Sequence, residues 1–187
     1  MSEQDEQRAM TIIVCPLSKV TEIVAMRAPE RVVSVLDPDF VFPELGDAYR
    51  DRHLRLRFHD IHLPTDGQVL PSQRHARALI GFLGAWDRSA PILIHCRAGV
   101  GRSTATAFIT ACLHNPGVDE LVIARTLRGA SPLARPNETL IALADAVMNR
   151  NGRMLRAIAD TGRGLPWIEV DENEPFEMPS RFREGTH

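Results

Sequence analysis

A cysteine and an arginine separated by five residues form the part of the sequence best suited to chemistry. They lie in the segment His95-Cys96-Arg97-Ala98-Gly99-Val100-Gly101-Arg102-Ser103. This segment joins an apolar run at 91–95, which predicts a strand, to an apolar stretch that predicts a buried helix beginning at Arg102. A thiolate is a strong nucleophile, and a guanidinium group can bind two oxygens of a phosphate at once. The spacing therefore predicts an oxyanion site beside a nucleophile.

The two glycines of this segment are expected to shape it as a loop. Gly99 and Gly101 allow backbone conformations that other residues avoid, so that successive amide N–H groups can turn inward and form a nest for a tetrahedral oxyanion. The N-terminus of the predicted helix adds free N–H groups and the positive end of its dipole. The same field stabilises a thiolate, so we predict that Cys96 is ionised and nucleophilic at neutral pH. These features indicate phosphoryl transfer.

The pattern His-Cys, five residues, Arg-Ser resembles the signature of the cysteine-based protein tyrosine phosphatases. The compact chain and the order of its elements are similar to the dual-specificity branch of that superfamily, including its small bacterial relatives. The resemblance implies that Cys96 attacks phosphorus to form a cysteinyl-phosphate, that Arg102 holds the equatorial oxygens and that Ser103 assists departure of the thiolate. It also implies that His95 orders the loop by hydrogen bonding and that the phosphate is bound by Arg97, Ala98, Gly99, Val100, Gly101 and Arg102.

A phosphatase of this type also needs a general acid, which the family takes from an aspartate upstream of the cysteine. Asp60 is the preferred candidate because it follows a predicted strand whose carboxyl end should adjoin the end of the 91–95 strand. Asp66 is the alternative, although an aspartate before a glycine is more often a turn residue. His59 and His62 flank Asp60, but their spacing matches no strong metal-ligand pattern, so neither a metal nor a cofactor is expected.

The expected substrate is a phosphomonoester, with phosphotyrosine in a protein as the leading interpretation and phosphoserine or phosphothreonine as further substrates. Arg97 adds positive charge beside the nucleophile and would also suit a phosphoinositide. Relatives that act on lipids typically carry a second basic residue later in the loop, where this chain has Val100. A phosphoinositide or inositol phosphatase of the same superfamily therefore stays an alternative. Phosphate, sulfate or vanadate is expected to bind in the loop.

Two other functions compete with this interpretation. One is a catalytically silent phosphate-binding module, although the presence of both Cys96 and Arg102 counts against it. The other is sulfur transfer, because rhodanese-like domains also place a reactive cysteine in a loop before a helix. Those loops as a rule lack paired glycines before Arg-Ser, which makes this third hypothesis the weakest.

Hydrophobic periodicity predicts an α/β domain with a mainly parallel sheet and helices on both faces, a fold like that of the dual-specificity phosphatases. Apolar or alternating runs predict strands at 11–15, 31–36, 54–58 and 91–95. Helical spacing predicts helices at about 18–27, 72–86, 118–128 and 137–149, besides the one after the loop, with Ser72 and Asn137 as N-caps.

The composition is that of one globular domain. The chain has 187 residues, of which 44% are hydrophobic and 25% charged, and its formal charge is −2. That charge argues against a general nucleic-acid partner, and no apolar run is long enough for membrane insertion. Three cysteines cannot form a complete disulfide framework, so a cytoplasmic location is expected, with Cys15 and Cys112 as core residues. Residues 1–150 are predicted to form the phosphatase domain and residues 151–187 a charged, peripheral C-terminal extension.

Overall fold

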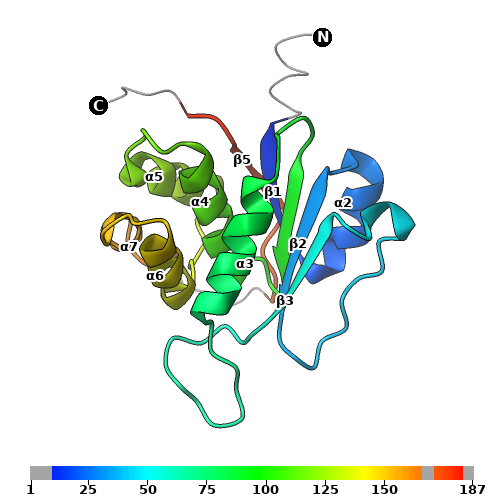
Figure 1. The fold of residues 1–187 in the computed structure, drawn as a ribbon, viewed down its shortest axis with the longest axis horizontal. Coiled ribbons are helices and arrows are strands. Elements are labelled where there is room, and N and C mark those ends of the chain that lie inside the picture. Colours follow the sequence, from blue (N-terminus) through cyan, green and yellow to red (C-terminus); the bar gives the residue numbers. More distant parts are fainter. Residues whose placement is uncertain (1–9, 166–170, 183–187) are drawn as a thin grey trace.

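A five-stranded sheet forms the centre of the computed structural model, which describes residues 10–165 and 171–182 (Figure 1). The strands are β1 (Thr11–Pro16), β2 (Arg31–Leu36), β3 (His53–Arg57), β4 (Ile92–Cys96) and β5 (Phe176–Pro179). Their order in the sheet is β3-β2-β4-β1-β5. The first four strands pair in parallel, and only β5 is antiparallel to its neighbour β1. The predicted fold class is therefore confirmed.

Helices cover both faces of the sheet. The helix α2 (Val20–Arg27) lies on one face, and α3 (Gln73–Gly84) and α4 (Arg102–His114) lie on the other (Figure 1). Beyond α4 come α5 (Glu120–Ala130), α6 (Glu138–Val147) and α7 (Arg153–Asp160). None of the helices in the described ranges combines the length and the apolar character that crossing a membrane requires. The predicted helices differ from the observed ones by a few residues at their ends, where hydrophobic periodicity carries little information.

Alternation along the buried strands divides the core into two parts. In β1, Ile12 and Val14 belong to the cluster under α3 and α4, whereas Ile13 and Cys15 belong to the cluster under α2. Successive side chains of a strand point to opposite faces, which explains why runs such as Ile12-Ile13-Val14-Cys15 are apolar throughout. Parallel pairing also places the carboxyl ends of β1 to β4 at one edge of the sheet, where functional loops of α/β folds gather.

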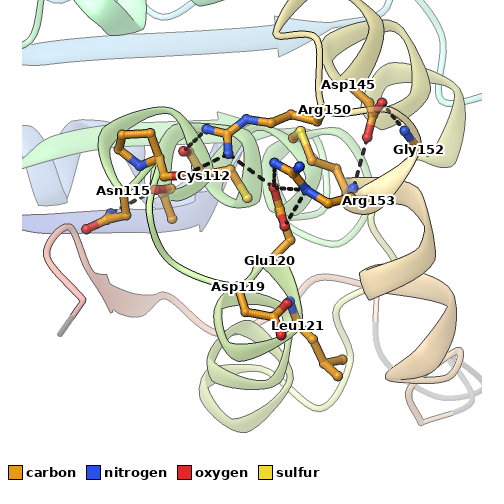
Figure 2. Close-up of polar contacts among 12 residues, drawn as sticks. Cys112, Asn115, Asp119, Glu120, Leu121, Asp145, Arg150, Gly152 and Arg153 are labelled. Atoms are coloured by element: carbon orange, nitrogen blue, oxygen red, sulfur yellow. Dashed lines mark hydrogen bonds and ion pairs between the residues drawn. The ribbon is translucent and has the colours of Figure 1, made fainter. Parts of the chain in front are cut away.

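The C-terminal extension is part of the fold and is not peripheral in the ranges 151–165 and 171–182. Asp145 of α6 accepts hydrogen bonds from Gly152 N at 2.6 Å and from Met154 N at 2.9 Å, which fixes the start of α7 (Figure 2). Glu120 of α5 pairs with Arg150 and with Arg153, each at 3.1 Å, and Glu120 and Arg150 are buried. These charged residues therefore bond to one another across helices, a pairing that composition does not reveal.

The end of the extension joins the sheet as β5. Ile12 of β1 is paired with Met178, whose side chain is 1% exposed and belongs to the main core. Glu177 forms an ion pair with Arg27 of α2. Residues 166–170 and 183–187 of the predicted extension lie outside the described residues.

Candidate active site

The segment between Cys96 and Arg102 forms a loop whose carbonyl groups point outward. Each carbonyl accepts a hydrogen bond from a backbone N–H group elsewhere in the fold or from a side chain. The pairs are Leu17 N to Arg97 O (3.1 Å), Asn173 N to Ala98 O (2.8 Å), Asn173 Nδ2 to Gly99 O (3.1 Å), Arg135 N to Val100 O (2.9 Å) and Asn137 N to Gly101 O (3.3 Å). Among the described residues, all peptide bonds are trans. In a trans peptide the N–H group points away from its carbonyl, so the amides of residues 98–102 face the inside of the loop.

Only one of the two loop glycines has the unusual backbone conformation that the sequence suggested. Gly99 has a φ of 73°, in the left-handed region that favours glycine. Gly101 has an ordinary φ of −101°, so the expectation of a special conformation is wrong there. Gly101 instead makes room for a neighbour, because a Cβ atom at this position would overlap with Asp60 Oδ2.

Cys96 and Arg102 are both nearly buried at the base of the loop. The Cys96 Sγ atom lies 3.1 Å from Ser103 Oγ, a distance at which the serine hydroxyl can donate a hydrogen bond to a thiolate. Arg102 donates from Nη1 to the Phe58 carbonyl at 2.6 Å. Its Nε atom is buried and has no partner among the described residues. An orphan guanidinium donor in this position is suited to an anion in the loop, since a buried donor is costly to leave unpaired.

Asp37 fixes the orientation of the Arg102 guanidinium group. Its carboxylate oxygens lie 3.0 Å from Nη1 and 3.4 Å from Nη2 of Arg102, and both side chains are largely buried. Asp37 follows β2 directly, at the carboxyl edge of the sheet. A role for Asp37 was not predicted from the sequence, because Asp37-Pro38-Asp39 also has the composition of an ordinary turn after a strand. The position of Asp37 directly after a buried parallel strand could have indicated a functional role, because functional residues gather at the carboxyl ends of such strands.

The structure brings Asp60 to the loop and leaves Asp66 away from it. Asp60 lines a cavity of about 810 Å³ that also contains Cys96 and Arg102, and Asp66 is not among the residues that line this cavity. Asn137 donates from Nδ2 to Asp60 Oδ1 at 2.7 Å, while its own side-chain oxygen caps α6. Asp66 is exposed and lies in the loop between His59 and Val69. The two ends of this loop are joined by a hydrogen bond from Val69 N to His59 Nδ1.

His95 belongs to a buried chain of hydrogen bonds behind the loop. Ser34 Oγ lies 2.5 Å from His95 Nε2 and 2.6 Å from His53 Nε2, and His95 Nδ1 lies 3.4 Å from the Cys96 carbonyl. Because a carbonyl only accepts, His95 donates from Nδ1, its Nε2 accepts from Ser34, and His53 donates from Nε2 to Ser34. Burial lowers the pKa of both His53 and His95 to about 4, so both rings are neutral at pH 7.

The rim of the cavity carries charges of both signs. Arg97 lies on it, and its guanidinium carbon is stacked over the Phe40 ring, 5.4 Å from the ring centroid. Asp171 and Glu172 of the C-terminal extension also line it. The next residue, Asn173, is buried and bonds to the loop through both its backbone and its side chain. None of these three extension residues was predicted to approach the site, because their sequence context is a charged run.

The other two cysteines lie in the core. Cys15 in β1 and Cys112 in α4 are each 1% exposed. Burial raises the pKa of Cys15 to about 12 and also raises that of Cys112. Both thiols are thus protonated at neutral pH. Among the described residues, no group of three or more histidine, cysteine or carboxylate side chains is arranged to hold a metal ion.

Comparison with known proteins identifies a matching family model and similar folds. The family model described as protein-tyrosine phosphatase matches residues 51–129, a range that contains Asp60 and the whole Cys96–Arg102 loop. No curated protein sequence matches the chain. The fold is similar to that of human tyrosine phosphatase-like serine/threonine/tyrosine-interacting protein, with 14% identity, a TM-score of 0.57, and coverage of 74% of this chain and 91% of the other.

Two further solved structures have a similar fold. Human DUSP28 is 14% identical with a TM-score of 0.56, covering 78% of this chain and 97% of its own. PTPMT1 in complex with PI(5)P is 13% identical with a TM-score of 0.50, covering 74% and 91%. The chain thus contains a segment, residues 51–129, that matches the protein-tyrosine phosphatase family model, and its fold is similar to that of solved dual-specificity phosphatase structures.

Proposed function

We propose that the protein is a cysteine-dependent phosphatase that hydrolyses phosphotyrosine in proteins. The observation that carries this proposal is the loop around Cys96, in which all the carbonyl groups are bound outward and beside which the buried Nε of Arg102 has no partner among the described residues. Inward amides and a fixed guanidinium group together neutralise a phosphate without a metal ion.

The first chemical step transfers the phosphoryl group to Cys96. The thiolate attacks phosphorus and forms the S–P bond while the bond from phosphorus to the substrate oxygen breaks. Asp60 gives its proton to the departing oxygen, so the alcohol or phenol leaves neutral. Arg102 holds two of the equatorial oxygens as charge shifts toward the leaving group, and Asp37 keeps the guanidinium in place.

The second step hydrolyses the cysteinyl-phosphate. The Asp60 carboxylate takes a proton from water, the resulting oxygen attacks phosphorus, and the S–P bond breaks. Cys96 leaves as a thiolate, and the Ser103 hydroxyl at 3.1 Å supplies a hydrogen bond to it. Inorganic phosphate is released, and both Cys96 and Asp60 return to their starting protonation states.

The charges around the cavity favour a phosphoprotein over a multiply phosphorylated headgroup. Asp171 and Glu172 line the cavity, and their carboxylates repel a second phosphate crowded next to the first. The loop position of Val100 is apolar. Cys96 is 2% exposed, so the nucleophile reaches a phosphate on an extended side chain more readily than one on a short side chain. A phosphoinositide stays the second candidate substrate because Arg97 adds positive charge at the rim.

Hydrolysis of p-nitrophenyl phosphate under reducing conditions, with EDTA present, tests the proposal. We expect turnover by the wild type, complete loss in Cys96→Ser with binding of vanadate retained, and no comparable loss in Cys112→Ala, which removes another buried thiol away from the cavity. Peptides carrying phosphotyrosine, phosphoserine or phosphothreonine and soluble phosphoinositides then rank the substrates. Absence of wild-type turnover together with phosphate binding would instead identify a phosphate-binding module.

A further inference from the structure

Two acidic side chains of the C-terminal extension form one wall of the cavity that contains the nucleophile. Asp171 and Glu172 are exposed, and both line the cavity of about 810 Å³ around Cys96. Within residues 10–165 and 171–182, neither carboxylate forms an ion pair. Glu172 accepts a hydrogen bond from the Ser18 hydroxyl at 2.5 Å, a neutral partner that does not offset its charge. This acidic wall, Asp171 and Glu172, therefore lacks a cationic partner in the described part of the chain.

The fold holds the acidic wall beside the phosphate loop. Asn173 directly follows Glu172 and donates two hydrogen bonds to carbonyls of the loop, at 2.8 and 3.1 Å. Ser18, which binds the Glu172 carboxylate, follows Leu17, whose backbone N–H group donates to a third loop carbonyl at 3.1 Å. Consecutive Cα atoms are about 3.8 Å apart, so Glu172 lies one residue away from a segment bonded directly to the loop. Its position relative to a bound phosphate is therefore fixed from two sides.

An independent observation points to an anion in the same cavity. Arg102 lines the cavity, its side chain is 5% exposed, and its buried Nε atom has no partner among the described residues. A buried donor is costly to leave unpaired, and the phosphate of a substrate supplies the missing acceptor. Because Asp171 and Glu172 are exposed, they meet the parts of the substrate that stay outside the base of the cavity.

The basic side chains that line the cavity do not neutralise the acidic wall. Arg97 is stacked over the Phe40 ring, 5.4 Å from its centroid, and Arg135 donates to the Leu165 carbonyl at 3.1 Å. Among the described residues, neither arginine forms an ion pair. The carboxylates of the wall thus stay available to a cation that the substrate itself carries, and such charge complementarity selects between partners.

We infer that Asp171 and Glu172 are specificity-determining residues that bind a lysine or arginine side chain next to the phosphotyrosine of a substrate protein. This inference rests on the proposed phosphatase function and specifies its substrate. A phosphorylated side chain bound at Cys96 brings its sequence neighbours to the mouth of the cavity, because residues of an extended chain follow one another at about 3.3 Å. A basic neighbour is attracted by the acidic wall, whereas an acidic neighbour is repelled by it.

Three phosphotyrosine peptides test this subsite, differing only in the residues on both sides of the phosphotyrosine, which are lysine, glutamine or glutamate. We expect the wild-type kcat/KM to be about fivefold higher for the lysine peptide than for the glutamine peptide, as an exposed ion pair gives, and lowest for the glutamate peptide. Asp171→Asn combined with Glu172→Gln should bring the three values close together. Glu174→Gln is the matched control, since Glu174 is an exposed carboxylate of the same segment that does not line the cavity, and it should keep the wild-type ratio.

Charge reversal separates an electrostatic role from a change of shape. Glu172→Lys should invert the order, so that the glutamate peptide becomes a better substrate than the lysine peptide. Raising the salt concentration should reduce the wild-type preference, because exposed charges are screened. A preference for lysine that persists in high salt and in the double variant would overturn the role of the two carboxylates.

Failure of this inference is distinguishable from failure of the proposed function. Turnover of p-nitrophenyl phosphate with equal kcat/KM for the three peptides overturns the subsite alone. If the wild type hydrolyses none of these compounds, calorimetric binding of the same peptides to Cys96→Ser still decides whether lysine neighbours add affinity. Preference for a soluble phosphoinositide over all three peptides overturns the assignment to a basic phosphoprotein segment.

Discussion

Asn173 holds the phosphate loop from the far end of the chain, donating from its side-chain nitrogen to the carbonyl of Gly99 at 3.1 Å. The same nitrogen donates to Ser131 Oγ at 2.8 Å, and the Asn173 backbone N–H group binds the Ala98 carbonyl at 2.8 Å. Asn173 thereby holds two consecutive loop carbonyls away from the cavity that contains Cys96. In the proposed reaction it acts only through the shape of the loop.

Asn173→Ala should therefore weaken catalysis without removing any group that contacts substrate. The Gly99 carbonyl and Ser131 lose a buried partner, which costs about 1–3 kcal/mol of unfolding free energy. We expect kcat/KM for p-nitrophenyl phosphate to fall about tenfold and the affinity for vanadate to fall in parallel, because both depend on the inward amides. Glu174→Gln, at the exposed neighbouring position, is the control. Unchanged vanadate affinity in Asn173→Ala would contradict a role in positioning the loop.

Asp60→Ala and Asp66→Ala distinguish the two candidate general acids. Asp60 lines the phosphate cavity and is oriented by Asn137, so its loss should slow the first step by ~10²–10⁴-fold, most for substrates with poor leaving groups. Asp66→Ala should leave the rate within a factor of about two, as usual for an exposed position away from the site. The reverse pattern in steady-state kinetics would assign the acid to Asp66.

Gly101→Ala should reproduce the kinetic defect of Asp60→Ala in a folded protein. The φ of −101° at Gly101 suits alanine, but the new methyl group would overlap with Asp60 Oδ2 and displace the carboxylate. The expected result is a loss of activity that is greatest with poor leaving groups, with an unchanged circular dichroism spectrum. Gly81→Ala on α3, where a Cβ atom meets open space, should keep full activity. An equally active Gly101→Ala would show that Asp60 need not occupy this position.

The buried histidines behind the loop should make the protein less stable in mild acid. The folded-state pKa of His53 and of His95 is lowered to about 4, against about 6.5 for an unfolded histidine, so the unfolded chain binds more protons between these values. The contribution of neutral burial is complete above pH 6.5 and is lost as the pH falls toward 4. It amounts to at most about 3 kcal/mol for each histidine.

Urea unfolding from pH 4 to pH 7 measures this effect. His53→Gln can keep an N–H donor toward Ser34 but cannot titrate, so its unfolding free energy should decline less steeply with acidification than that of the wild type. His62→Gln, at an exposed position, should follow the wild-type slope. Parallel curves for the wild type and His53→Gln would contradict the contribution of the buried ring.

The sequence predicted those parts of this protein that depend on residues close to one another along the chain. Cys96, Gly99 and Arg102 are close along the chain, so a strand, a tight loop and a helix bring them together with little help from the rest of the fold. The strands and helices followed from hydrophobic periodicity, and Asp60 from its place after a strand. Asn137 was predicted as the cap of its helix and has that role.

The tertiary structure alone decided which distant residues contact one another at the site. Asp37, Asp60 and Asn173 reach their partners Arg102, Asn137 and Gly99 across separations of 65, 77 and 74 residues. Such contacts arise from strand order and from the path of the C-terminal extension, neither of which hydrophobic periodicity encodes. The extension illustrates the reason: its charged side chains suggested a solvated segment, whereas the pairing of its Arg153 with the buried Glu120 and the addition of β5 to the sheet join it to the core.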